Sequence, residues 1–346
     1  SMTSEVASLV LRNNYLQSLA ISLAERKGLE NREELGRLMS ALEAAGKLNR
    51  KVETLPNDAE FTERYIAGKL LTRPEIGVLL SYAKLTLFDT LVASNLPDDA
   101  YLQHLLVSYF PAKMQKNYAG DIEAHRLRRE IIATVLANDV VNRGGPGFVQ
   151  KLCDASGLLA ADVVKAAIIV QDGFGLDRLW NAIDKLDNAL PGDIQNGLYA
   201  RVSQIFLDAT RLFLQTQTMD DRSMGDGIAR LKDAIKSLQP LLVKRLPSAD
   251  VLEENGVPTE LEKELSVLAH LVFTPEIMQI TERAGTTLTR AAESYASVST
   301  TFRMTRLLEA SSRIITGDHY ESLALSRGQD LIASSRRRIV ISALTA

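Results

Sequence analysis

The sequence predicts an all-α fold: a multi-helix bundle of about a dozen or more helices with no significant sheet. Three observations support this prediction. Apolar residues recur at steps of three and four along almost the whole chain, helix-start signals alternate with turn signals, and aromatic residues make up only 5%. A β protein is richer in aromatic residues and alternates apolar with polar positions.

The first segment shows the helical periodicity clearly. In residues 4–26, "SEVASLVLRNNYLQSLAISLAER", apolar side chains follow steps of three and four at positions such as Val6, Leu9, Leu19 and Leu23. One face of an α-helix repeats with this spacing, because the helix has about 3.6 residues per turn. The segment is therefore predicted to be an amphipathic helix.

Capping boxes mark several helix starts. In this motif a polar side chain caps the first free backbone N–H groups, and an acidic side chain three residues later reaches back to the cap. Pro74 and Pro275 fall in first turns, where the missing N–H of proline costs little. The predicted boxes are Asn31 with Glu34, Thr72 with Glu75, and Thr259 with Glu262.

Turn signals separate the helical runs, and one polar segment is a candidate domain boundary. Residues 215–227, "QTQTMDDRSMGDG", are polar and contain glycine. They divide a helical subdomain, 1–215, from a second helical bundle, 216–346, or they join two long helices of one continuous bundle. Glycine and proline also cluster in "NRGGPG", "QDGFG", "LPGD" and "EENGVP".

The composition indicates no charged partner. The 346 residues have a formal net charge of −3, so we expect neither nucleic acid nor an anionic membrane as a partner. No stretch is expected to reach the length of a membrane span, and no signal peptide opens the chain. Cys153 is the only cysteine, which excludes an intrachain disulfide and suits a reducing compartment. A cytoplasmic location is predicted.

No catalytic or metal-binding constellation is expected. The four histidines lie far apart, and none has a second His or Cys at the spacing of a metal site. The serines lack the G-x-S-x-G elbow of a hydrolase. Cys153 falls where a helix would bury a small apolar side chain. We therefore predict no catalytic, cofactor-binding or metal-binding residue in this chain.

One segment briefly resembles a dinucleotide-binding turn. In "AAIIVQDGFGLDRLW" (166–180), Gly173 and Gly175 give G-x-G, but Arg178 stands at the third glycine position. No acidic residue follows at the distance at which it would bind the ribose. The segment is predicted to be the end of one helix and the start of the next. "RGGPG" likewise lacks the Lys-Ser or Lys-Thr of a phosphate loop.

Residues 121–145, "DIEAHRLRREIIATVLANDVVNRGG", are predicted to form an interior helix, because apolar residues occupy most of its circumference. Asn138 is expected to be buried and hydrogen-bonded, since it lies on the same face of the helix as Ile131 and Val135. Ile132, Leu136 and Val140 lie towards the other side. The expected buried face comprises Leu127, Ile131, Thr134, Val135, Val141 and Asn142.

The charged residues of this helix need partners. Asp139 precedes Arg143 by four positions, the favourable order for an ion pair within a helix. The arginines crowd the first half, against the helix dipole, so acidic or carbonyl partners elsewhere are expected. The structural interpretation competes with an anion- or effector-binding site and, less favourably, with a nucleic-acid site. The candidate structural or interface residues are His125, Arg128, Arg129, Glu130, Asn138, Asn142 and Arg143.

Three consecutive arginines, 336–338, occur in the last segment, "SSRRRIVISALTA". Consecutive side chains spread around a helix and form no stripe. We interpret them as ordinary positive charge near a helix C-terminus, which the dipole stabilises.

Several phrases along the chain together carry a family resemblance. They are "VASLVLRNNYLQSLAIS" (6–22), "LNRKVETLPNDAEFTER" (48–64), "LTRPEIGVLLSYAK" (71–84), "LPDDAYLQHLLVSYFP" (96–111), "HRLRREIIATVLANDVVNRGG" (125–145), "LWNAIDKLDNALPGDIQNGLY" (179–199) and "DHYESLALSRGQDL" (318–331). These phrases resemble the C-terminal region of the large bacterial NAD-dependent glutamate dehydrogenases. The resemblance covers almost the whole chain, and its first two-fifths are the most distinctive.

The resemblance implies a parent enzyme that converts L-glutamate, NAD and water to 2-oxoglutarate, ammonium and NADH. In the family, the catalytic residues and the Rossmann glycines lie in an upstream domain, so none is assigned here. The implied partners are that upstream catalytic domain and further copies of the parent in a homo-oligomer. Two alternatives remain: a stand-alone helical interaction module, and a self-sufficient enzyme with an unrecognised site.

Overall fold

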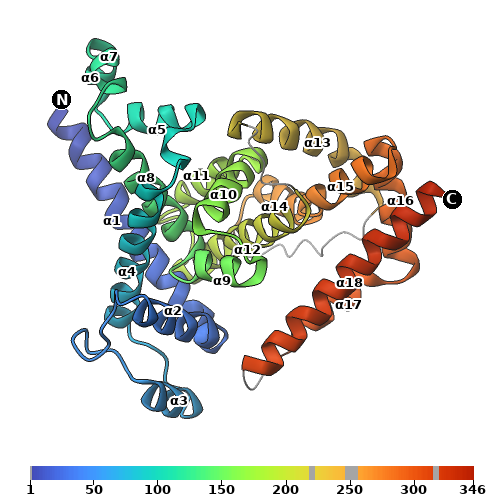
Figure 1. Ribbon diagram of the computed structural model, residues 1–346, viewed down its shortest axis with the longest axis horizontal. Coiled ribbons are helices and arrows are strands. Elements are labelled where there is room, and N and C mark those ends of the chain that lie inside the picture. Colours follow the sequence, from blue (N-terminus) through green and yellow to red (C-terminus); the bar gives the residue numbers. More distant parts are fainter. Residues whose placement is uncertain (1, 218–222, 246–255, 315–318) are drawn as a thin grey trace. The chain divides into compact units, whose positions relative to one another are not determined.

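The computed structural model describes residues 2–217, 223–245, 256–314 and 319–346, and is shown in Figure 1. Every regular element in these ranges is an α-helix or a short 3-10 helix, and none of the described residues forms a strand. The predicted all-α fold is confirmed. Residues 218–222, within the candidate boundary segment, 253–255 of "EENGVP" and 318 lie outside the described part.

The chain forms two compact units, which differ from the predicted subdomains. Unit 1 comprises residues 1–168 and 221–226, and unit 2 comprises residues 169–220 and 227–346. The division falls inside a helix, Ala160–Phe174, whereas the sequence places the candidate boundary near residue 215. Whether 1–215 and 216–346 act as separate domains stays a prediction.

Unit 1 is built around three helices that pack on one another, α1, α4 and α8 (Figure 1). Leu79, Leu91, Ile132 and Val140 are fully buried on α4 and α8. The elements are α1 (Met2–Lys27), η1 (Gly28–Asn31), α2 (Arg32–Ala44), α3 (Asp58–Ile66), α4 (Arg73–Ala93), η2 (Leu96–Asp98), η3 (Ala100–Leu102), α5 (Gln103–Ser108), α6 (Ala112–Asn117), α7 (Ala119–Glu123), α8 (Arg128–Gly144), α9 (Phe148–Ser156) and the first part of α10 (Ala160–Phe174).

One of the three predicted capping boxes forms. Thr72 caps α4: its backbone N–H donates to Glu75 Oε2 at 2.7 Å, and its hydroxyl accepts from the Glu75 N–H. The box at Asn31 is wrong, because the buried Asn31 amide donates to the Ala24 carbonyl at 2.9 Å instead.

The box at Thr259 is also wrong, because Glu262 is buried and binds Arg201 at 2.8 Å. A box that the sequence analysis did not predict joins Asn57 and Glu60 at the start of α3. Capping competes with tertiary contacts for the same side chains, so spacing alone cannot decide it.

Helix α4 corrects the expectation that no segment reaches the length of a membrane span. It has 21 residues, and an 18-residue window within it has a mean hydropathy of 1.5, so by length and composition it could cross a membrane. The same composition is typical of a helix at the centre of a bundle. In unit 1, α4 packs against α1, α2 and α8.

Unit 2 has its core around α11 and α12. Trp180 and Phe206, both buried, meet edge to face with ring centroids 5.9 Å apart. Helix α12 packs against α11, α14 and α15. The elements are the end of α10, α11 (Leu176–Asp184), α12 (Gly192–Thr216), most of α13 (Met224–Arg245), α14 (Thr259–Leu271), α15 (Thr274–Ala284), α16 (Leu288–Thr301), α17 (Met304–Ser312) and α18 (His319–Thr345).

A buried ion cluster joins α15, α16 and α18. Glu276 is fully buried and accepts hydrogen bonds from Arg336 at 2.7 Å, from Arg337 at 2.5 Å and from the Tyr295 hydroxyl at 2.7 Å. The Arg336 guanidinium lies 4.5 Å from the Tyr295 ring centroid and 4.8 Å from that of Phe273. The interpretation of residues 336–338 as dipole-stabilising charge near a helix C-terminus is wrong, because α18 runs on to Thr345 and has no basic residue in its last turn. Arg336 is instead buried, at 1% exposed.

We predict that Glu276→Gln strongly destabilises the chain. The variant leaves the buried Arg336 without its carboxylate, and breaking a buried ion pair in this way costs about 3–5 kcal/mol. Chemical denaturation should show a lower free energy of unfolding. Glu282→Gln is the control, since Glu282 is on the same helix but its ion pair with Arg230 is largely exposed. Equal effects of the two substitutions would contradict the prediction.

Candidate functional site

Arg129 ties the start of α8 to the end of α4. Its Nη2 donates to the carbonyls of Val92 at 3.0 Å and Ser94 at 2.7 Å, and its Nη1 donates to the Asp98 carboxylate. The last carbonyls of a helix have no partner within the helix, so Arg129 supplies donors where α4 needs them. These are the acidic and carbonyl partners expected from the sequence. Arg128 adds a weaker contact to Asp98 at 3.6 Å.

The other residues before and within the first turn of α8 make local contacts. His125 Nδ1 accepts the Leu127 N–H at 3.2 Å, and the His125 ring lies 5.8 Å from that of Phe110. Glu130 is half-buried, and its backbone carbonyl accepts from the Thr134 hydroxyl at 2.7 Å. His125 therefore helps to shape the chain just before the helix.

The buried face of α8 agrees with the predicted one only at Val141 and Asn142. Asn138 is only half-buried, and none of the described residues hydrogen-bonds to its side chain, so the prediction of a buried, hydrogen-bonded Asn138 is wrong. Leu127 is 45% exposed. Both sides of α8 are apolar, and the sequence could not show which side faces α4 and α1. The buried residues are Ile132, Ala133, Leu136, Ala137, Val140, Val141, Asn142 and Arg143.

Asn142 and Arg143 are buried at the end of α8, 4% and 7% exposed. The predicted ion pair between Asp139 and Arg143 is confirmed, with 3.9 Å between Oδ1 and Nε. The Asn142 Oδ1 atom is buried and has no hydrogen-bond partner among the described residues. A buried polar atom of this kind costs stability unless water reaches it.

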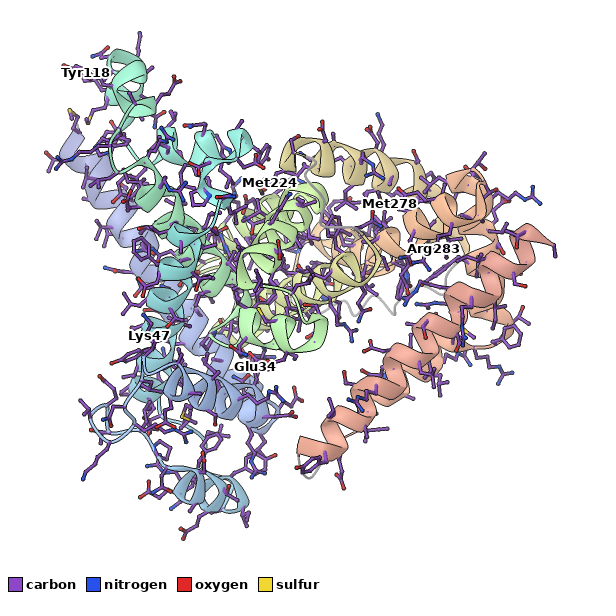
Figure 2. All side chains as sticks on the ribbon, viewed as in Figure 1. Glu34, Lys47, Tyr118, Met224, Met278 and Arg283 are labelled. Carbon is purple, nitrogen blue, oxygen red and sulfur yellow. The ribbon has the colours of Figure 1, made fainter. Side chains whose placement is uncertain are left out.

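The glycines that follow α8 permit close packing. A Cβ on Gly144 would lie 2.3 Å from the ring of Phe148, which is buried, and Gly145 has a φ of 97°, a backbone conformation suited to glycine. A Cβ on Gly147 would lie 2.3 Å from Cγ of Glu34, which α2 presents to this turn (Figure 2). Packing, as opposed to phosphate binding, explains these glycines.

We predict that Gly144→Ala destabilises the chain by about 1–3 kcal/mol, because a methyl group there overlaps an aromatic ring that cannot move freely. Gly120→Ala is the matched control in the same unit, since its Cβ would meet nothing within 4 Å. Thermal unfolding of both variants should show a lower midpoint for Gly144→Ala only. An unchanged midpoint would show that Phe148 can move aside.

The segment that resembles a nucleotide-binding turn is helical. Residues 166–170 lie within α10, and Gly175, with φ 66° and ψ 38°, is the left-handed residue directly before α11. A Cβ on Gly173 would lie 2.6 Å from Leu231, so this glycine serves helix packing in unit 2. The predicted helix end and helix start are confirmed.

Two titratable groups in unit 1 are strongly perturbed. Burial, together with the nearby Asp154 and Asp162, raises the pKa of Cys153 to about 11, so this half-buried thiol stays protonated near neutral pH. Burial lowers the pKa of Lys84 to about 8. Lys84 Nζ is buried and has no hydrogen-bond partner among the described residues. Within the described ranges no group of three or more His, Cys, Asp or Glu side chains could hold a metal ion.

Lys84 would be a candidate catalytic lysine by its pKa alone. However, its Nζ atom is covered by protein. It lies in the apolar run "LLSYAKLTLF" of α4, a signal that the sequence analysis could have used. We interpret it as a core lysine.

We predict that Lys84→Met raises the thermal midpoint at pH 7. Because the folded-state pKa is about 8 against an ordinary value of 10.5, the unfolded chain binds more protons between these pH values. Lys84 therefore lowers the free energy of unfolding by its full amount below pH 8, and by less and less as the pH rises towards 10.5. The higher midpoint of Lys84→Met should shrink over the same pH range. Lys116→Met, at an exposed position of α6, is the control. A constant advantage across this pH range would contradict the prediction.

Comparison with known proteins identifies the family. The family described as "Glutamate dehydrogenase, C-terminal" matches residues 68–346. This chain belongs to that family. It is 35% identical to the NAD-specific glutamate dehydrogenase of Pseudomonas aeruginosa and 33% identical to that of Halomonas elongata, and each match covers 99% of the chain and 22% of the relative.

A third relative, the NAD-specific glutamate dehydrogenase of Mycobacterium tuberculosis, is 27% identical, again over 99% of this chain and 22% of the relative. The chain thus spans 22% of the length of the relatives that it matches. The suspected resemblance to the C-terminal region of the large NAD-dependent glutamate dehydrogenases is confirmed.

Proposed function

We propose that this chain is a non-catalytic helical domain of a large NAD-dependent glutamate dehydrogenase, where it supports the architecture of the subunit. The parent enzyme converts L-glutamate, NAD and water to 2-oxoglutarate, ammonium and NADH. NAD binds to the catalytic part of the parent, which is also the first partner of this domain. The parent is a cytoplasmic homo-oligomer.

The environment of Arg129 is the observation that best supports a structural role. Its guanidinium donates to two carbonyls at the end of α4 and to Asp98, so its donors are directed to protein groups. An arginine that binds an effector would direct its N–H donors to a solvent-accessible pocket. The close packing of Gly144 and Gly147 in the same segment supports the same role.

We predict that Arg129→Ala in the full-length enzyme lowers the amount of folded protein and its thermal midpoint. The change removes hydrogen bonds from a charged donor, each of which contributes about 1.5–3 kcal/mol. The Michaelis constants for glutamate and NAD of the surviving molecules should stay unchanged. Arg126→Ala, at an exposed position two residues before α8, is the control. If Arg129→Ala keeps full stability but abolishes a response to an anionic metabolite, α8 is a regulatory site and the proposal fails.

We also predict that this chain alone neither oxidises glutamate nor binds NADH with useful affinity. In the G-x-G segment that resembles a nucleotide site, Gly173 lies within α10, and Gly175 is the single residue between α10 and α11. Calorimetric titration of the chain with NADH should give no saturable heat. A stoichiometric micromolar site would overturn the proposal, because the catalytic part would then not be needed for binding.

A further inference from the structure

The first half of α1 presents an apolar face to solvent. Met2, Val6, Leu9 and Val10 are 43–54% exposed. Met2, Val6 and Leu9 stand at steps of four and three residues, so they lie on one side of the helix. Isolated exposed apolar residues are ordinary, but a contiguous set at helical spacing indicates an interaction surface.

This exposed face continues a face that is buried further along the same helix. The same steps lead on to Ala20 and Ala24, which are buried together with Leu19. Helix α1 packs against α4 and α8 within unit 1, and its buried residues all lie in its second half. The first half has the same kind of face without an equivalent covering in the described structure. The neighbours that the structure shows for the first half are Ser108 at the end of α5 and the start of α6, where the Ala112 N–H donates to Glu5.

A groove runs beside the exposed face. It has a volume of about 490 Å³ and lies between α1 and the segment that joins α5 to α6, with Leu9, Phe110 and Pro111 among its lining residues. The Ala112 N–H donates to Glu5 Oε2 at 2.8 Å and joins the two walls. Apolar groups on a helix beside a groove suit an amphipathic helix as the binding partner.

Two exposed aromatic side chains lie in and after the segment that joins α5 to α6. Tyr109, next to the groove, is 50% exposed, and Tyr118, at the junction of α6 and α7, is 54% exposed (Figure 2). Aromatic side chains contribute much of the binding energy at protein interfaces. The ring of Phe110 in the groove wall also contacts His125, one of the candidate interface residues from the sequence.

The groove has no net charge, which favours an uncharged protein surface as the partner over nucleic acid or an anionic membrane. One acid, Glu5, and one base, Arg12, line it, so it has no net charge. Glu5 is engaged by Ala112, and Arg12 lies 5.8 Å from the Tyr15 ring centroid. Nucleic acid or an anionic membrane would require a basic surface. The groove is lined by polar groups such as Ser4, Ser8 and Gln115 as well as by apolar ones, and the apolar part of the surface is the neighbouring face of α1.

We propose that the exposed face of α1 and its groove bind an amphipathic helix of the catalytic part of a full-length glutamate dehydrogenase. The relatives contain enough further sequence to include such a helix, because the matching region is only 22% of each. The family description places the matching region at the C-terminal end. In these relatives the remaining sequence therefore precedes the segment that corresponds to α1. This inference rests on the proposed function.

Photo-crosslinking in the full-length protein tests the surface directly. p-Benzoylphenylalanine replaces Leu9 in one sample and Leu159, 74% exposed in the same unit, in the control. After irradiation, mass spectrometry should find peptides from outside these 346 residues joined to position 9, and none joined to position 159. Cross-links from position 9 only to another copy of the 346 residues, only to an unrelated protein, or to nothing would overturn the proposal.

Charge substitution separates this surface from the core. Val6→Asp and Leu9→Asp should leave the thermal midpoint of the 346-residue chain unchanged, because both side chains are already exposed. In the full-length enzyme the same changes should reduce the folded, active fraction on the order of tenfold, since a buried unpaired charge is costly. Leu159→Asp should have neither effect. A lower midpoint of the chain itself, or an unaffected enzyme, would overturn the proposal.

The two proposals can fail separately. If Arg129→Ala leaves the fold intact but abolishes an effector response, the structural role fails while the cross-links from position 9 still locate the docking surface. If Arg129→Ala destabilises the enzyme as expected but position 9 gives no cross-link to the catalytic part, only the docking surface is wrong.

Discussion

The packing of α8 against α4 is the constraint on which unit 1 depends. Both helices bury apolar residues, and at the end of α4 the unpaired carbonyls meet the guanidinium of Arg129. A helix end buried without donors is costly, and an arginine with several N–H groups can satisfy two carbonyls and a carboxylate together. The contact fixes how far along α4 the first turn of α8 lies. The glycines at 144, 145 and 147 then let the chain turn tightly into α9.

In unit 2, too, charged hydrogen bonds fix the position of helices, but here the carboxylate is fully buried. Glu276 accepts from two arginines and a tyrosine and so joins three helices at one point. Apolar packing alone permits helices to slide past one another, whereas a buried carboxylate has only a few acceptable positions. The aromatic rings on either side of Arg336 offset part of the cost of removing its charge from water. In each unit, polar groups set the register of helices that apolar groups hold together.

This distribution of polar and apolar groups fits a domain that organises a larger enzyme. Arg129, in residues 121–145, binds the Asp98 carboxylate inside unit 1. The apolar side chains in the first half of α1 are exposed. The perturbed groups, Lys84 and Cys153, are shielded by protein. Their pKa values follow from burial, and the thiol of Cys153 is consequently a poor nucleophile at neutral pH.

The sequence by itself determined the family, from phrases spread along almost the whole chain. It also determined the helical class, the cap of α4 at Thr72 and the ion pair within α8, because these depend on residues close together in the chain. Tertiary structure decided the rest. Asn31 and Glu262 bind other residues and do not form the predicted capping boxes. Asn138 lies off the buried face, and Arg336 is buried. Each outcome depends on which helix packs alongside, and helices that are apolar on several sides give no local signal of that choice.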